Sequence, residues 1–269
     1  MKRGYYFLLL LLCLPGCMGA QLKPSADDLR NIRTIKVVAM EAPPLEVPPS
    51  PSGATLFGAS ASMVLIPEQS LQNGGRIGVM VAGILMLADL PEAMRKAAKT
   101  AVTIDSLLVN GDAWLPTVVL VQEAARQIAA AGRPDVAVRA GLQSLPGIQN
   151  RERTFFGENW QEPLRNWYDE DSSRSDYRPL RQQGIDAVVE VGLLNYALYQ
   201  DTLIVQVCLK LVDPVTGRVL GRGRATDYLK TMELATIFAD NGRQFKEMFS
   251  TLGNRLLAKN LRDIGLLPE

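Results

Sequence analysis

The sequence predicts an α+β fold: a two-layer domain in which helices pack on one face of a mainly antiparallel sheet. Three observations favour this class: a β-branched run at 32–40, consecutive strand patterns between 184 and 228, and helical periods at 116–131 and 232–264. The consecutive strands predict a three-stranded meander, to which the N-terminal strand is added. We expect one such domain over residues 32–269.

The chain begins with a segment typical of secretory signals. Lys2 and Arg3 precede an almost wholly apolar run at 5–14. That run is too short for a bilayer span, which needs about 20 apolar residues. We therefore expect a signal peptide at 1–16.

The residues that follow the apolar run indicate a lipid anchor. The sequence LPGC at 14–17 resembles the lipobox of bacterial lipoproteins, in which the cysteine becomes the acylated first residue of the mature chain. The resemblance implies lipidation of Cys17 and a lipidated tether at 17–31. Met18, not Asp, follows the cysteine, which implies the periplasmic face of the outer membrane as the destination. A signal peptide cleaved elsewhere, with Cys17 unmodified, is the alternative.

An insert interrupts the domain after its first strand. Residues 32–40 (IRTIKVVAM) have the composition of a buried strand. The insert at 41–111 is first rich in proline, which cannot donate hydrogen bonds to a sheet, and then rich in glycine and apolar residues. Its apolar part at 74–90 predicts a buried segment beside the core; an element that dips into the membrane or packs subunits is the alternative.

A helix and a long loop follow the insert. Residues 116–131 place apolar side chains on one face, with Pro116 in the first turn and Gly132 past the end. A short strand is expected at 135–139. Residues 142–179 combine turn formers, charges and aromatic residues, and they predict a surface loop with some helix, where recognition tends to occur.

The meander is predicted from strand patterns at 185–199, 202–212 and 218–227. The turn at 213–217 (DPVTG) contains Pro to preset φ, Asp to bond its own backbone and Gly for the left-handed position. The C-terminal residues 232–264 have a helical period that is broken near Asn241 and Gly242.

The register of the second hairpin leads to a candidate site. Pairing of Val212 with Arg218 would place Leu209 opposite Gly221, and it would leave Gly221 and Gly223 on the apolar face, where a helix can approach closely. The other face would then carry a polar and basic strip: Gln206, Cys208, Lys210, Arg218, Arg222 and Arg224. We predict that its basic members, Lys210, Arg218, Arg222 and Arg224, bind an anionic ligand such as a polysaccharide or phosphate. A solvated sheet face is the alternative.

The order of these elements on a lipidated chain resembles a family of small outer-membrane lipoproteins. That family includes the curli-secretion pore subunit, the penicillin-binding-protein activators and polysaccharide-export lipoproteins. The residues that carry the resemblance are IRTIKVVAM at 32–40, the helix at 116–131, GIDAVVEVGLLNY at 184–196 and LKLVDPVTGRVLGRGRA at 209–225. The resemblance implies a component of an export or cell-wall assembly that binds another envelope protein or a polysaccharide. It leaves self-association into a homo-oligomer open.

Composition favours a structural or binding protein over an enzyme. The 29 Lys and Arg residues balance 28 Asp and Glu residues, which argues against a nucleic-acid partner. The chain has no His, so a Ser-His-Asp triad, a Cys-His pair and the usual zinc ligand are absent. Cys208 lies in an apolar strand pattern and is predicted to be a buried, inert thiol. We expect no cofactor and no bound metal.

Two other functions remain open from the sequence. A glycan-acting enzyme needs only two suitably spaced carboxylates, and the candidates are Glu152, Glu158, Glu162, Asp169, Glu170 and Asp171. A membrane-inserting channel component would use the apolar segment at 74–90.

Overall fold

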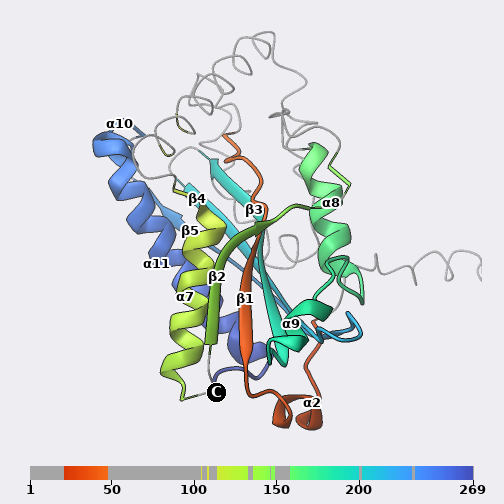
Figure 1. The fold of residues 1–269 in the computed structure, drawn as a ribbon. Coiled ribbons are helices and arrows are strands. Elements are labelled where there is room, and N and C mark those ends of the chain that lie inside the picture. Colours follow the sequence, from red (N-terminus) through yellow and green to blue (C-terminus); the bar gives the residue numbers. More distant parts are fainter. Residues whose placement is uncertain are drawn as a thin grey trace, which may run out of the picture.

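The computed structural model describes residues 21–47, 104, 108, 114–132, 136–145, 147–148, 158–199, 202–231 and 234–268. Within these ranges the chain forms a five-stranded sheet in the order β2-β1-β3-β4-β5 (Figure 1). The strands are β1 (Ile35–Met40), β2 (Val136–Gln143), β3 (Ala187–Tyr199), β4 (Thr202–Val212) and β5 (Val219–Lys230). The longest ladders are antiparallel and join β3, β4 and β5, whereas β1 pairs in parallel with β2 and β3. The α+β class, the meander and the added N-terminal strand are thus confirmed.

The main helical layer covers one face of this sheet (Figure 1). It consists of α7 (Pro116–Ala130) and α11 (Ala239–Asp263). Pro116 begins α7, as predicted from its fixed φ. Where the two helices meet, Gly253 permits a close approach, because a Cβ at this position would lie 2.5 Å from Leu120 Cδ2. The main core lies between these helices and the apolar face of β1, β3, β4 and β5.

The opposite face of the sheet is also covered. Helix α8 (Glu158–Asp169) comes from the predicted loop at 142–179, and α9 (Arg178–Gln182) begins at the end of that loop. Both helices lie on the side away from α7 and α11 (Figure 1). Trp167 of α8 packs with Met40 and Cys208 in a second apolar cluster. The helical layer predicted for one face is therefore joined by a smaller one on the other.

The register predicted for the second hairpin is wrong by a small shift. Val212 pairs with Val219, and a bulge beside Val212 then sets Leu209 opposite Gly223. The bulge inserts one extra residue in the ladder, a feature that apolar alternation does not specify. Gly223 nevertheless lies on the apolar face as predicted, since a Cβ there would come 3.2 Å from the Asn260 carbonyl oxygen of α11.

The C-terminal helical segment is broken where the sequence predicted. It consists of α10 (Leu234–Ile237) and α11, and the first turn of α11 contains a kink. Asp240, Asn241 and Gly242 all have positive φ angles, of 52°, 57° and 71°. Asn and Gly tolerate this left-handed region better than other residues, so the sequence permits the kink at this place.

Part of the predicted tether is folded. Residues 21–31 contain helix α2 (Ala26–Arg30), and Leu22 exchanges backbone hydrogen bonds with Arg222 of β5. The signal peptide, Cys17 and the apolar segment at 74–90 lie outside the described residues. At the start of the insert, Leu45 is buried and Glu46 bridges to Ala197 of β3. Among the helices of the described ranges, none is both long and apolar enough to cross a membrane.

Candidate functional site

The predicted basic strip shares one face of β4 and β5. Lys210 pairs with Arg222 and Cys208 pairs with Arg224 across the ladder, so their side chains lie on the same side of the sheet. This is the face turned away from the main core, as the alternation indicated. Arg218 precedes β5 and is separate from the others, beside α2.

Helix α8 covers the strip and contacts its charges. Lys210 is fully buried, and its Nζ donates to the backbone oxygen of Trp167 at 2.7 Å. Arg222 donates through Nη1 to the carbonyls of Tyr168 and Asp169, at 3.3 Å and 2.7 Å. These carbonyls belong to the last turn of α8, where intrahelical donors are missing and the helix dipole is negative. Two cations from the sheet therefore cap the C-terminus of α8.

The burial of Lys210 and Arg222 overturns the alternative of a solvated sheet face for this part of the strip. Arg222 is 6% exposed, and its Nη2 also forms an ion pair with Asp171. The Arg224 guanidinium carbon lies 5.7 Å from the centre of the Tyr168 ring. Burial lowers the pKa of Lys210, and the neighbouring Glu190 opposes that shift. Binding of an anionic ligand by the strip stays a prediction, and it would require α8 to move aside.

Glu190 anchors the segment that contains α8 to the sheet. It is fully buried on β3, and its carboxylate accepts hydrogen bonds from three side chains. Trp167 Nε1 donates to Glu190 Oε2 at 2.7 Å, while Ser173 Oγ and the Tyr177 hydroxyl donate to Oε1 at 2.5 Å and 2.9 Å. Burial, followed by the charge of Glu190, raises the pKa of Tyr177. These donors solvate the carboxylate in place of water, which a buried charge requires.

A glycine beside Glu190 makes room for this arrangement. A Cβ on Gly192 would lie 2.6 Å and 2.7 Å from the Cζ3 and Cη2 atoms of the Trp167 ring. The ring therefore rests directly on the backbone of β3. In this position Trp167 also donates to Glu190. Gly192 therefore makes room for the ring, and Glu190 holds it by a hydrogen bond.

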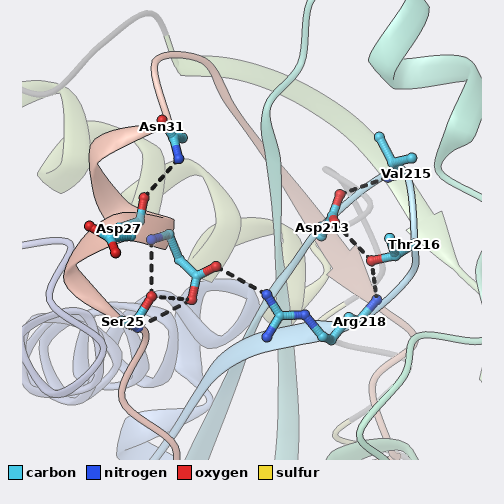
Figure 2. Close-up of polar contacts among 8 residues, drawn as sticks. Ser25, Asp27, Asn31, Asp213, Val215, Thr216 and Arg218 are labelled. Carbon is cyan, nitrogen blue, oxygen red and sulfur yellow. Dashed lines mark hydrogen bonds and ion pairs between the residues drawn. The ribbon is translucent and has the colours of Figure 1, made fainter.

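The remaining basic candidate, Arg218, joins α2 to the turn before β5 (Figure 2). Ser25 caps α2 by accepting from the backbone N–H of Asp28 at 3.1 Å. The hydrogen bond from the Ser25 side chain lowers the pKa of Asp28. Arg218 Nη2 lies 3.0 Å from Asp28 Oδ1, and the turn is held by Asp213, which accepts from Val215 N at 2.9 Å.

A pocket of about 240 Å³ adjoins this contact. Its lining comes from α2 and the residues after it, from α9, from the residue before β3, and from the turn and the start of β5: Asp28, Asn31, Ile32, Arg181, Asp186, Asp213, Val215, Arg218 and Leu220. The charges in the lining pair with one another, Arg218 with Asp28 and Arg181 with Asp186. Asp186 also accepts from the backbone N–H groups of Arg33 and Thr34, at 2.9 Å and 3.0 Å. The charged side chains of the pocket wall therefore have partners within the chain.

The carboxylates considered for glycan chemistry are scattered along α8 and its end. Glu170 pairs with Arg174, and Asp171 pairs with Arg222. Glu152 and the side chain of Glu158 lie outside the part of the chain that the structure describes. In the described part of the chain, no three His, Cys, Asp or Glu residues are grouped so as to hold a metal ion.

Cys208 lies under α8, as the strand pattern predicted. It is a free thiol, it is fully buried, and burial raises its pKa. A protonated, inaccessible thiol is a poor nucleophile.

The role of Glu190 was not predicted from the sequence. Glu190 and Gly192 are one charged and one small residue on the same face of an otherwise apolar strand, and that exception to the pattern was the available signal. Its partners are 13 to 23 residues away along the chain, so no local motif records them.

Comparisons with known proteins give only distant matches. No family model and no curated protein matches the chain. The PelC dodecamer from Paraburkholderia phytofirmans is 13% identical with a TM-score of 0.38, and the match covers 91% of this chain and 96% of that chain. Lipoprotein GNA1162 from Neisseria meningitidis is also 13% identical, with a TM-score of 0.26 and coverage of 82% and 98%. The chain is thus loosely similar to these two proteins, at a level that supports no conclusion about activity, partner or assembly.

Proposed function

We propose that this chain is a lipid-anchored structural or binding protein of a bacterial cell envelope, held on the periplasmic face of the outer membrane through Cys17. The observation that carries the proposal is the sequence LPGC at 14–17, directly after a short apolar run with a basic N-terminus. Each acyl CH₂ buried in a membrane contributes about 0.8 kcal/mol, so two or more chains anchor a protein stably.

In this proposal the domain has no catalytic role and serves an export or cell-wall assembly by binding another envelope protein or a polysaccharide. Two observations support a non-catalytic role. The sequence lacks His, the commonest general base. The buried charged groups Glu190, Lys210 and Arg222 hold α8 on the sheet, a task that accounts for their contacts. Self-association into a homo-oligomer belongs to the same proposal.

Fatty-acid labelling of the full chain tests the anchor. The chain is expressed with its own N-terminus in a bacterium with two membranes that is fed an alkyne analogue of palmitate. We expect label in the wild type and in Cys13→Ser, whose cysteine lies within the signal peptide, and no label in Cys17→Ser. Membrane fractions should contain the first two proteins. Label that persists in Cys17→Ser, or an unlabelled wild type recovered without membranes, would contradict the proposal.

A further inference from the structure

The N-terminal segment is fixed to the outer edge of β5 at successive points. Leu22 exchanges backbone hydrogen bonds with Arg222, at 2.8 Å and 3.0 Å. Beyond them, Gln21 Nε2 donates to the carbonyl of Arg224 at 3.2 Å. The bridge at Leu22 is antiparallel, so at Gln21 the chain leads back toward the C-terminal end of β5.

Packing and charge keep this segment in place. A Cβ on Gly221 would lie 2.6 Å from Pro24 Cγ and 3.2 Å from the Leu22 carbonyl, so only glycine lets the segment lie against β5. On the far side of Pro24, the ion pair between Asp28 and Arg218 fixes α2 (Figure 2). These contacts therefore fix the place at which the chain before Gln21 leaves the edge of β5.

Cys17 is only four residues before Gln21, which limits its position. A fully extended chain covers about 3.3–3.6 Å per residue, so the Cys17 Cα lies within about 14 Å of the Gln21 Cα. Residues Arg224 to Tyr228 of β5 span about 13 Å. An acyl chain on Cys17 must therefore enter the membrane near the C-terminal half of β5.

The side chains at this end of β5 suit a lipid surface. Tyr228 is 53% exposed and Leu22 is 37% exposed, and Lys230 is exposed as well. Arg224 lies on the same face of the strand as Tyr228 and Lys230. Tyr and Lys place an apolar body in the interface and a polar end in water, and cations attract anionic headgroups.

We propose that the domain lies against the membrane with this surface, formed by Leu22, Arg224, Tyr228 and Lys230, toward the lipid headgroups. The inference rests on the proposed function, because the anchor on Cys17 brings the bilayer within reach. The turn at 213–217, at the other end of β5, then faces away from the bilayer. Val219 and Tyr228 are about 30 Å apart along the strand.

Depth-dependent quenching tests this orientation. The lipidated full chain is reconstituted into vesicles of phosphatidylethanolamine and phosphatidylglycerol that contain brominated lipid. A thiol-reactive fluorophore is placed at Tyr228→Cys or at the matched control Val215→Cys; the native side chains are 53% and 54% exposed. Cys208 is buried and Cys17 carries the lipid, so only the introduced thiol should react. We expect bromolipid to quench the fluorophore at 228 and to leave the one at 215 bright.

A longer tether provides the second arm. Twelve Gly and Ser residues inserted after Met18 have a root-mean-square length of about 19 Å. This variant should still float with the vesicles, and quenching at position 228 should fall toward the level at 215.

The outcomes separate the two proposals. A chain that is unlipidated and does not float with vesicles contradicts the anchor itself. A chain that floats, but whose two fluorophores are quenched equally or in the reverse order, overturns the orientation alone. Undiminished quenching at 228 after the insertion would overturn the role of the short tether.

Discussion

The contact between Gly192 and Trp167 can be tested by adding a single methyl group. Gly192→Ala places a Cβ 2.6 Å from Trp167 Cζ3 and 2.7 Å from Cη2. Optimal contact between carbon atoms is about 3.5–4.0 Å, so the overlap is about 1 Å. The ring is 4% exposed, and it cannot retreat without lengthening the 2.7 Å hydrogen bond from its Nε1 to Glu190.

The expected cost follows from that overlap. Extra methyl groups in a well-packed core typically destabilise a protein by about 1–3 kcal/mol. We expect Gly192→Ala to lie in this range. Trp167→Phe removes the benzo ring that holds Cζ3 and Cη2, so in that background the same methyl group should cost less than about 0.5 kcal/mol.

The four proteins of this double-mutant cycle are compared by urea unfolding in mild detergent. Far-UV circular dichroism is the readout, because a tryptophan is changed. Gly253→Ala is the matched control, since its methyl would lie 2.5 Å from Leu120 Cδ2 on the other side of the sheet. Its effect on stability should be the same with Trp or Phe at 167, because Leu120 and Trp167 lie on opposite sides of the sheet.

The reasoning fails if the cost of Gly192→Ala does not depend on residue 167. It also fails if Gly192→Ala leaves the urea midpoint unchanged, because the ring would then have free space beside β3. Coupling between Gly253→Ala and Trp167→Phe would indicate a general loss of cooperativity in place of a local contact.

Three further predictions concern other buried groups. Partial burial opposes ionisation of Asp186, but hydrogen bonds from Arg33, Thr34 and Arg181 outweigh it and lower its pKa. The carboxylate therefore stabilises the fold above the unfolded pKa of about 3.9, and this contribution is lost as the pH falls through the lower folded pKa. The difference in urea midpoint between wild type and Asp186→Asn should thus be larger at pH 7 than at pH 3; an equal difference would refute the assignment. Asn260 is fully buried and donates to the Val207 carbonyl at 2.9 Å, so Asn260→Ala should cost about 1–3 kcal/mol in thermal unfolding. The exposed control Lys259→Ala should change stability by less than about 0.5 kcal/mol, and equal effects would count against the Asn260 bond. Cys208 should resist thiol reagents in the folded chain and react in urea; rapid reaction before unfolding would show that α8 does not cover it.

Much of the fold could be predicted from local patterns. Alternation of apolar residues gave β3, β4 and β5 nearly to their ends, and the proline at 116 marked the start of α7. The hairpin register was wrong, yet the two glycines kept their predicted face, because a shift of two residues preserves the side of a strand. A bulge changes pairing without changing composition, so the sequence alone does not reveal it.

The candidate site was predicted in part. The sequence grouped Lys210, Arg222 and Arg224 on one face, and the structure agrees. It did not reveal their partners, because the carbonyls at the end of α8 belong to the backbone and have no residue signature. Two basic residues in a strand look the same whether they bind a ligand, face water or cap a helix that arrives from a distant part of the chain.

The bond between Gln21 and Arg224 also has a consequence for the order in which the chain folds. The two residues are 203 positions apart, and Asp28 and Arg218 are 190 apart. Contacts of such high sequence separation form late, since the entropy of closing a long loop must first be overcome. During synthesis the N-terminus emerges first, whereas β5 emerges near the end. If Cys17 is anchored early, residues 21–24 can bind to the edge of β5 only after this last strand has joined the sheet.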